Sequence, residues 1–216
     1  MNPVLRRAAL GLVAFGLLWA GCASAQEPVP APTLVVGDRW VYRHLDSWDR
    51  PTRIVREILA ATDERVELTQ TKEGSDRVLR TMYGAGWSLE AQETHPGRIR
   101  SFEPALRFFD FPLSPGKTWE SRSVYENWLG NGVVTEMLKG RVEEWENVEV
   151  PAGRFRAIKL SVEGRQIRMG NMSRRPSFDA VSYSIWYVPA IKNYVKYVAD
   201  EGFSRDTYEL LEYAAR

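Results

Sequence analysis

The sequence has few of the residues that build metal and redox sites. Its 216 residues include one cysteine, Cys22, and two histidines, His44 and His95. Neither histidine has a second His or Cys at the short spacing that metal ligands share. We therefore expect no metal site and no cofactor, and we expect each histidine to be a surface or hydrogen-bonded residue.

Catalytic motifs are absent as well: there is no Gly-x-Ser-x-Gly elbow and no glycine-rich phosphate loop. Carboxylates do gather, with five glutamates over residues 136–149, including Glu143, Glu144, Glu146 and Glu149. Two carboxylates can divide acid and base roles only where burial separates their pKa values. We expect these glutamates on an exposed strand edge and turn, where their charge discourages edge pairing. A non-catalytic protein is therefore predicted.

A strong charge of either sign is lacking too, because 29 basic residues oppose 28 acidic residues. Loss of residues 1–25 would remove Arg6 and Arg7 and leave 27 basic against 28 acidic residues. Such a balance supplies no field that attracts nucleic acid.

The N-terminus predicts export. Arg6 and Arg7 precede a short apolar stretch over residues 8–20, and Ala23-Ser24-Ala25 fits a signal-peptidase site. Residues 1–25 are thus predicted to be a cleaved signal peptide, giving a periplasmic or secreted protein. The alternative is a lipoprotein, because Leu18-Trp19-Ala20-Gly21-Cys22 also resembles a lipoprotein signal. Acylation of Cys22 would then anchor the protein to a membrane.

The rest of the chain reads as β-structure. Residues 26–33 contain three prolines and predict an extended, mobile tether. Residues 34–216 predict a single antiparallel domain, because short runs of β-branched and aromatic residues alternate with turn residues. The predicted strands are 39–46, 52–60, 65–72, 77–83, 87–93, 118–127, 133–144, 147–150, 155–167, 179–188, 194–200 and 204–213.

Alternation is clearest over residues 156–163, where Ile158, Leu160 and Val162 share one face. A period of two with one polar face predicts a sheet that is packed on one side only. The expected architecture is an all-β, curved antiparallel sheet that forms a half-barrel or a barrel. Periodicity does not separate a closed barrel from a sandwich.

Two further patterns concern the middle of the chain. Residues 103–109 predict one or two helical turns, with Pro104 at the first helical position. In addition, Val36-Gly-Asp-Arg-Trp40 and Pro115-Gly-Lys-Thr-Trp119 both place glycine three residues before tryptophan at a strand start. This repeat suggests two related half-sheets joined through residues 103–116.

Four short motifs resemble the TapB-like group, exported bacterial β-proteins classed as a domain of unknown function. They are Gly37-x-x-Trp40-x-Tyr42, Phe111-Pro112-Leu113-x-x-Gly116-x-x-Trp119, Val150-Pro-Ala-Gly-x-Phe155 and Trp186-Tyr187-x-Pro189. The resemblance covers about residues 34 to 200. It implies a barrel-like or half-barrel fold in the envelope and no established enzyme activity.

Two sets of residues are candidates for binding. A curled sheet would enclose an apolar groove, and its aromatic residues Trp87, Trp128, Trp186 and Tyr187 could contact a hydrophobic ligand. Residues 164–176 predict a long hairpin loop that presents Arg165, Arg168, Arg174 and Arg175 to an anion or a protein partner.

The resulting hypothesis is a non-catalytic envelope protein that binds a lipid-like or other hydrophobic ligand, or another envelope protein. One alternative is an envelope hydrolase that uses acidic residues, which requires a buried carboxylate beside a second titratable group. The other alternative is a purely structural role in assembly.

Overall fold

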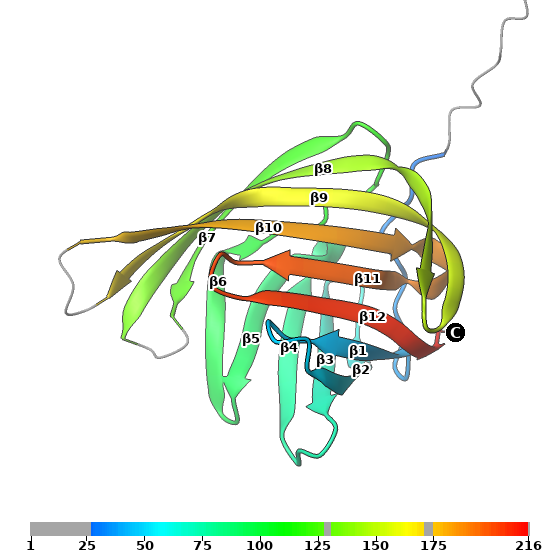
Figure 1. Ribbon diagram of the computed structural model, residues 1–216, viewed down its shortest axis with the longest axis horizontal. Helices are drawn as coiled ribbons and strands as arrows, with labels where there is room; N and C mark the ends of the chain where they lie inside the picture. Colours follow the sequence, from blue (N-terminus) through cyan, green and yellow to red (C-terminus); the bar gives the residue numbers. More distant parts are fainter. Residues whose placement is uncertain (1–26, 128–130, 171–174, 216) are drawn as a thin grey trace, which may run out of the picture.

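The strands close into one antiparallel barrel (Figure 1). The computed structural model describes residues 27–127, 131–170 and 175–215, which contain twelve strands and two short 3-10 turns. No helix in these three segments is long and apolar enough to cross a membrane. The elements are β1 (Arg39–Leu45), β2 (Pro51–Ala61), β3 (Arg65–Lys72), β4 (Val78–Gly84), η1 (Ala85–Trp87), β5 (Leu89–His95), β6 (Arg98–Leu106), β7 (Thr118–Glu126), β8 (Gly132–Val150), β9 (Gly153–Gly170), β10 (Ser177–Val188), η2 (Pro189–Ile191), β11 (Asn193–Asp200) and β12 (Arg205–Ala214).

Each strand pairs with its neighbour in the chain, and β1 pairs with β12 to close the ring. The all-β prediction is confirmed, and the barrel is complete rather than a half-barrel. Closure leaves no unpaired sheet edge at the join of the first and last strands. The predicted inward face of β9 is confirmed, because Ile158, Leu160 and Val162 are all fully buried.

The helical turns predicted over residues 103–109 are wrong, because Glu103–Leu106 belongs to β6. A strand tolerates proline at a position where the missing N–H is not needed for pairing. Such a position exists here, since the register between β6 and β7 contains one pair, Glu103 with Val124. The predicted strands 133–144 and 147–150 are one element, β8, with an irregularity between Val142 and Trp145.

The repeated glycine-tryptophan pattern forms the same turn twice. Gly37 and Gly116 have φ angles of +88° and +85°, which favour glycine. The N–H of Gly37 donates to Ile58 O at 3.1 Å, and the N–H of Gly116 donates to Val142 O at 2.9 Å. Both turns start a strand that belongs to the same barrel, so the pattern repeats a turn without dividing the sheet.

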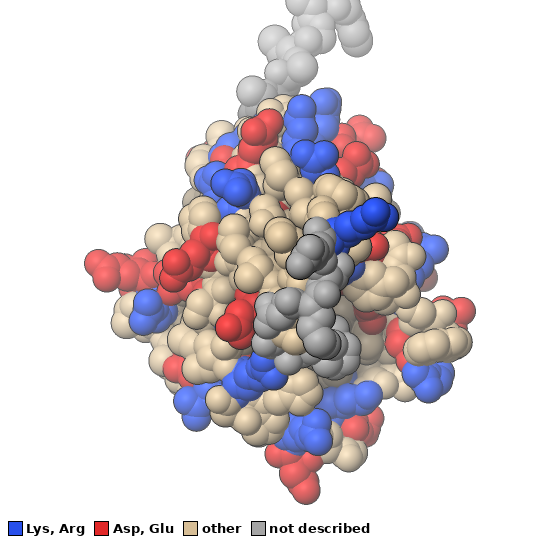
Figure 2. All heavy atoms as spheres, turned by 90° about the vertical axis from the view of Figure 1, so that its left-hand side faces the viewer, with Lys and Arg blue, Asp and Glu red and all other residues tan. Residues whose placement is uncertain are grey.

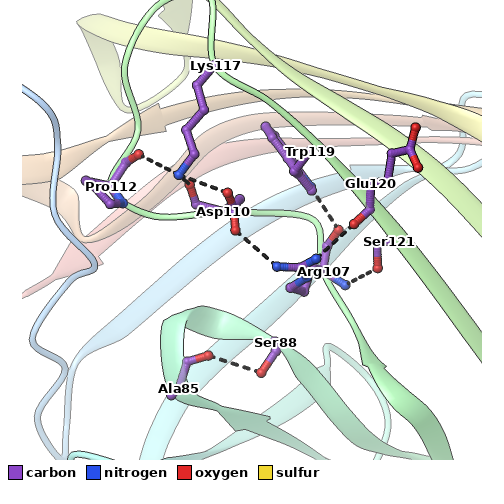
Figure 3. Close-up of polar contacts among 9 residues, drawn as sticks. All are labelled: Ala85, Ser88, Arg107, Asp110, Pro112, Lys117, Trp119, Glu120 and Ser121. Carbon is purple, nitrogen blue, oxygen red and sulfur yellow. Dashed lines mark hydrogen bonds and ion pairs between the residues drawn. The ribbon is translucent and has the colours of Figure 1, made fainter.

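Residues 107–117 connect β6 to β7 at one end of the barrel, and Figure 3 shows the polar contacts that hold this connector. Asp110 lies between Arg107 and Lys117, at 3.1 Å and 2.9 Å. Arg107 also donates to Glu120 O at 2.9 Å and accepts a 3.3 Å hydrogen bond from Trp119 Nε1 at its carbonyl. These contacts fix the connector to β7. The aromatic side chains of the connector are thereby held at this end of the barrel.

Aromatic packing completes that end. Phe109 stacks on Phe111 at 5.5 Å and meets Trp87 and Tyr187 edge to face. Val29, in the segment predicted as a mobile tether, instead exchanges backbone hydrogen bonds with Leu113 at 2.8 Å and 2.7 Å. Val29 and Leu34 of the N-terminal segment are therefore part of the buried core, whereas residues 30, 31 and 33 between them are exposed.

Candidate functional site

The barrel encloses a cavity of about 790 Å³. This volume falls in the range of small-molecule sites, which are usually concave and largely apolar with a few polar groups. Its walls come from eleven of the strands, β2 to β12, and from the connector. The lining residues are Arg56, Leu68, Tyr83, Trp87, Leu89, Gln92, Arg100, Phe102, Leu106, Phe108, Phe109, Tyr125, Asn127, Val134, Glu136, Gln166, Arg168, Tyr183, Ile185, Asn193, Tyr194, Tyr197, Ala199, Glu201, Phe203, Asp206 and Tyr208.

Apolar side chains form the deep part of the cavity. Leu106 at the end of β6 and Phe109 in the connector are buried, and Trp87 stacks on Tyr83 at 5.6 Å. The cavity reaches the surface near the β11–β12 turn, where its lining residue Phe203 is 63% exposed. Figure 2 looks onto this end of the barrel and shows basic and acidic residues interspersed around it. A strong field of one sign is therefore absent from the visible part of this face.

A buried carboxylate, Glu136, organises one part of the wall. It is 2% exposed and accepts hydrogen bonds from Tyr125 Oη at 2.7 Å, Tyr183 Oη at 2.9 Å and Gln166 Nε2 at 3.3 Å. Three donors on three different strands thus compensate the charge, which burial alone would make costly. The prediction that the glutamates of 136–149 are exposed is wrong for this residue.

A second carboxylate lies beside this group. Glu201 Oε1 is 3.4 Å from the hydroxyl of Tyr183, which also contacts Glu136. Burial raises the pKa of the Glu201 carboxyl, and the charge of Glu136 raises it further. Since Tyr183 has one hydroxyl proton, it cannot donate to both carboxylates at once. A protonated Glu201 would resolve this by donating to the phenol oxygen.

A guanidinium, Arg56, occupies another part of the wall. It lies near the rings of Tyr42, Tyr194 and Tyr208, at 5.7 Å, 5.6 Å and 5.2 Å from their centroids. Its Nε donates to Gln70 Oε1 at 2.9 Å, and Nη1 donates to the hydroxyl of Tyr194. Arg56 faces inward because it is paired in register with Trp40, which is fully buried.

The aromatic residues predicted to bind a ligand lie in different places. Trp87 lines the cavity, and its buried Nε1 makes no hydrogen bond with the described residues. Tyr187 is buried instead among Phe109 and Phe111 at the connector end of the barrel. Trp186 faces outward between Lys159 and Lys196. Trp128 lies outside the described residues.

The predicted basic loop is wrong in part, because residues 164–170 continue strand β9, which pairs with β10. Alternation then sends its arginines to opposite faces. Arg165 is exposed, whereas Arg168 lines the cavity and forms an ion pair with Asp179. Arg175 is exposed after the β9–β10 connection, and Arg174 lies outside the described residues.

The histidine predictions fit the structure. His44 contacts Asp206 at 2.6 Å and stacks on Tyr208, and His95 is exposed. No group of three or more His, Cys, Asp or Glu residues that could hold a metal ion occurs among residues 27–127, 131–170 and 175–215.

Sequence reasoning missed Glu136, Arg56 and Glu201. For Glu136 a signal was present: it shares the period-two face of Val134 and Leu138, which are apolar and buried. A charge on an apolar face predicts a buried, hydrogen-bonded group. The same signal was present for Arg56, which shares the period-two face of the buried Ile54 and Ile58 on β2. For Glu201, the carboxylate of Glu136 that acts on it lies on a strand distant in sequence, so local patterns did not reveal it.

No family model and no curated protein matches the chain. Membership of the TapB-like group therefore stays a prediction. The chain is similar in fold to an inferred lipoprotein from Parabacteroides distasonis, with TM-score 0.51 and 12% identity over 88% of this chain and 100% of that one. It is also similar to an inferred exported protein with a YmcC-like fold from Bacteroides fragilis, with TM-score 0.53 and 12% identity over 87% and 99% of the two chains. At such identities the likeness shows a shared barrel fold.

Proposed function

We propose that this protein is an exported envelope protein that binds an amphipathic, lipid-like small molecule inside its barrel. The observation that carries the proposal is the interior cavity of about 790 Å³, lined by apolar side chains and a few charged ones. Leu68, Leu89 and Ile185 offer an apolar surface for hydrocarbon, whose transfer from water is favourable. The basic and acidic groups of the same cavity would orient a polar head.

The export signal gives this binding site its proposed place. A signal at residues 1–25 would send the protein to the periplasm or beyond, and acylation of Cys22 would hold it at a membrane. The two structural neighbours described as exported or as a lipoprotein are in keeping with an envelope location. In either case the cavity would face a compartment in which lipids pass between membranes.

Native mass spectrometry of protein purified from its own envelope tests the binding. We expect a complex whose extra mass is lost on delipidation. Ala199→Phe should abolish it, because Ala199 is buried in the cavity wall. Val198→Phe is the matched control, since the neighbouring side chain points to the opposite face. Unliganded wild-type protein, or retention by the Ala199 variant, would contradict the proposal.

The same spectra test the location. A polypeptide mass that starts at Gln26 indicates a free periplasmic or secreted protein. A chain that starts at Cys22 and carries a covalent diacyl or triacyl group indicates a membrane-anchored lipoprotein.

A hydrolase is a second candidate, favoured by one observation. Glu136 and Glu201 contact the same phenol, Tyr183, inside a cavity, and the pKa of Glu201 is raised. A protonated Glu201 could donate to a leaving group while the carboxylate of Glu136 removes a proton from water. Glu136 already accepts three hydrogen bonds from protein side chains, so its oxygens are engaged within the wall, which places this candidate second.

Hydrolysis of p-nitrophenyl dodecanoate and of p-nitrophenyl glycosides separates the two candidates. A hydrolase predicts turnover that Glu201→Gln abolishes. A binding protein predicts that wild type and Glu201→Gln leave the substrates equally intact.

A further inference from the structure

The guanidinium of Arg56 has more N–H donors than it has acceptors in contact with it. Two of its nitrogens have partners, Gln70 and Tyr194, but Nη2 makes no hydrogen bond with the described residues. Arg56 also forms no ion pair with any carboxylate in the described part of the chain. Among the other charged lining groups, Arg168 pairs with Asp179, and Asp206 contacts His44. Arg100 likewise forms no ion pair in the described part of the chain, and it lies over the ring of Tyr125 beside the Glu136 group.

Three tyrosines near Arg56 also have hydroxyls without a hydrogen-bond partner among the described residues. The hydroxyls of Tyr83, Tyr197 and Tyr208 make no hydrogen bond with the described residues, yet none of them is sealed from the cavity. The rings are close together, since Tyr197 lies 5.9 Å from Tyr208 and 5.4 Å from Tyr194. Polar groups that open into a cavity without protein partners are available to a ligand.

These phenols stay protonated at neutral pH. Burial raises the pKa of Tyr197 well above its usual value, and it also raises the pKa of Tyr83 and Tyr208. Each hydroxyl can therefore donate a hydrogen bond. A guanidinium and three phenols then face the same space, where an ionised acceptor would form charge-assisted hydrogen bonds.

We propose that Arg56, with Tyr83, Tyr197 and Tyr208, forms an anion-binding subsite, and that the ligand is an amphiphile with a carboxylate or phosphate head. This inference rests on the proposed function, because it assumes that the cavity takes a ligand. It adds the sign of the head group and the residues that select it. The apolar walls at Leu68 and Leu89 would hold the tail.

A purely structural role for Arg56 predicts something different. Cation–π contact with three tyrosine rings partly offsets the cost of burying the guanidinium. In that case Arg56 would support the packing of β1, β2 and β12 and would have no effect on which ligands bind. Selection by charge therefore distinguishes the two roles, whereas stability alone does not.

Calorimetric titration of the delipidated protein with dodecanoate, dodecyl phosphate, dodecanol and inorganic phosphate, near neutral pH, tests the inference. We expect Arg56→Gln to weaken dodecanoate and dodecyl phosphate by about 10- to 100-fold and dodecanol by less than about twofold. Arg53→Gln is the matched control, because Arg53 lies on the same strand but faces outward to Glu212. Tyr197→Phe with Tyr208→Phe should weaken both anions by about threefold to tenfold while keeping the rings.

Unchanged dodecanol affinity shows that the Arg56 variant keeps its fold and its cavity. Equal wild-type affinity for dodecanoate and dodecanol, or an anion preference that survives Arg56→Gln, would overturn the subsite and leave the hydrophobic cavity standing. Inorganic phosphate that binds as tightly as dodecyl phosphate would support the subsite and overturn the lipid-like ligand. Failure of all four compounds to bind would overturn both proposals.

Discussion

The cavity wall contains two charged groups that are accommodated in opposite ways. Glu136 is surrounded by donors that point at it, so its charge is compensated within the protein. Arg56 has tyrosine rings, one carboxamide oxygen and the hydroxyl oxygen of Tyr194 around it, and it forms no ion pair with a carboxylate of the described residues. The charge of Glu136 is therefore compensated without a ligand, whereas the charge of Arg56 lacks an anionic partner. The comparison predicts that Glu136 serves stability and Arg56 serves binding.

Removal of the Glu136 side chain should give the largest loss of unfolding free energy. Glu136→Ala takes a charged acceptor from Tyr125, Tyr183 and Gln166 and leaves their donors buried, which we expect to cost about 3 kcal/mol of unfolding free energy. Urea titration measures this loss. Glu144→Ala, an exposed position on the same strand, should stay within about 0.5 kcal/mol of wild type. Equal losses in the two variants would mean that the hydrogen bonds of Glu136 do not stabilise the barrel.

Two tyrosines offer a comparison of the same substitution. Tyr183→Phe removes a hydroxyl that contacts both carboxylates, and we expect a loss of about 1–2 kcal/mol. Tyr197→Phe removes a hydroxyl that has no partner among the described residues, so we expect a change within about 0.5 kcal/mol. Thermal or urea unfolding of the two variants provides the measurement. A larger loss at Tyr197 would show that its hydroxyl is already satisfied in the free protein.

Replacement of Arg56 by methionine should change stability little. The substitution removes two hydrogen bonds, but it also removes a buried cation that has no carboxylate partner. Replacing a buried charge by an apolar side chain of similar size often changes the unfolding free energy little. We expect the unfolding free energy to change by less than about 1 kcal/mol in either direction. A loss as large as that of Glu136→Ala would assign Arg56 to the core instead of the ligand site.

The sequence predicted which faces of the strands are buried. It predicted less well which side chains from other strands contact those faces. Alternation over residues 156–163 predicted the buried face of β9, and the glycine before Trp40 predicted a strand start. Both signals are local, since they depend on neighbouring residues and backbone angles. The cavity is not local, because β1 must pair with β12 before Arg56 and Tyr208 can meet.

The same limit explains the errors around Glu103–Leu106 and Gly164–Gly170. Pro104 suggested a helix start, but pairing with neighbouring strands overrode that preference. Glycines and basic residues near 164–170 suggested a loop, yet Gly164 is needed where its missing side chain lets β8 approach: a Cβ there would lie 2.0 Å from Met137 O. Local propensity is weak evidence where cross-strand contacts decide the structure.

The smallest expected effect is on the pH dependence of the unfolding free energy. It distinguishes the surroundings of Glu136 and Glu201 from those of Arg56. Burial, together with the charge of Glu136, raises the pKa of Glu201 above its ordinary value of 4.5. The native state therefore holds this proton more tightly than the unfolded chain does. Its contribution to stability is fully present below about pH 4.5 and is lost as the pH rises through the native pKa.

Glu201→Gln lacks this titration, so the wild type should lose stability relative to the variant between about pH 4 and about pH 8. Urea titrations of both proteins at these two values measure the difference. Repeating the pair in a Glu136→Gln background should reduce the pH dependence, because one of its two causes is removed. A difference that is constant with pH would mean that the pKa of Glu201 is the same in the native and unfolded states. Glu201 would then be ionised at neutral pH, which would also remove the acid from the hydrolase candidate. The charges that act on the Arg56 guanidinium are those of tyrosines, which do not titrate in this interval, so the stability change of Arg56→Met should be nearly the same at both pH values.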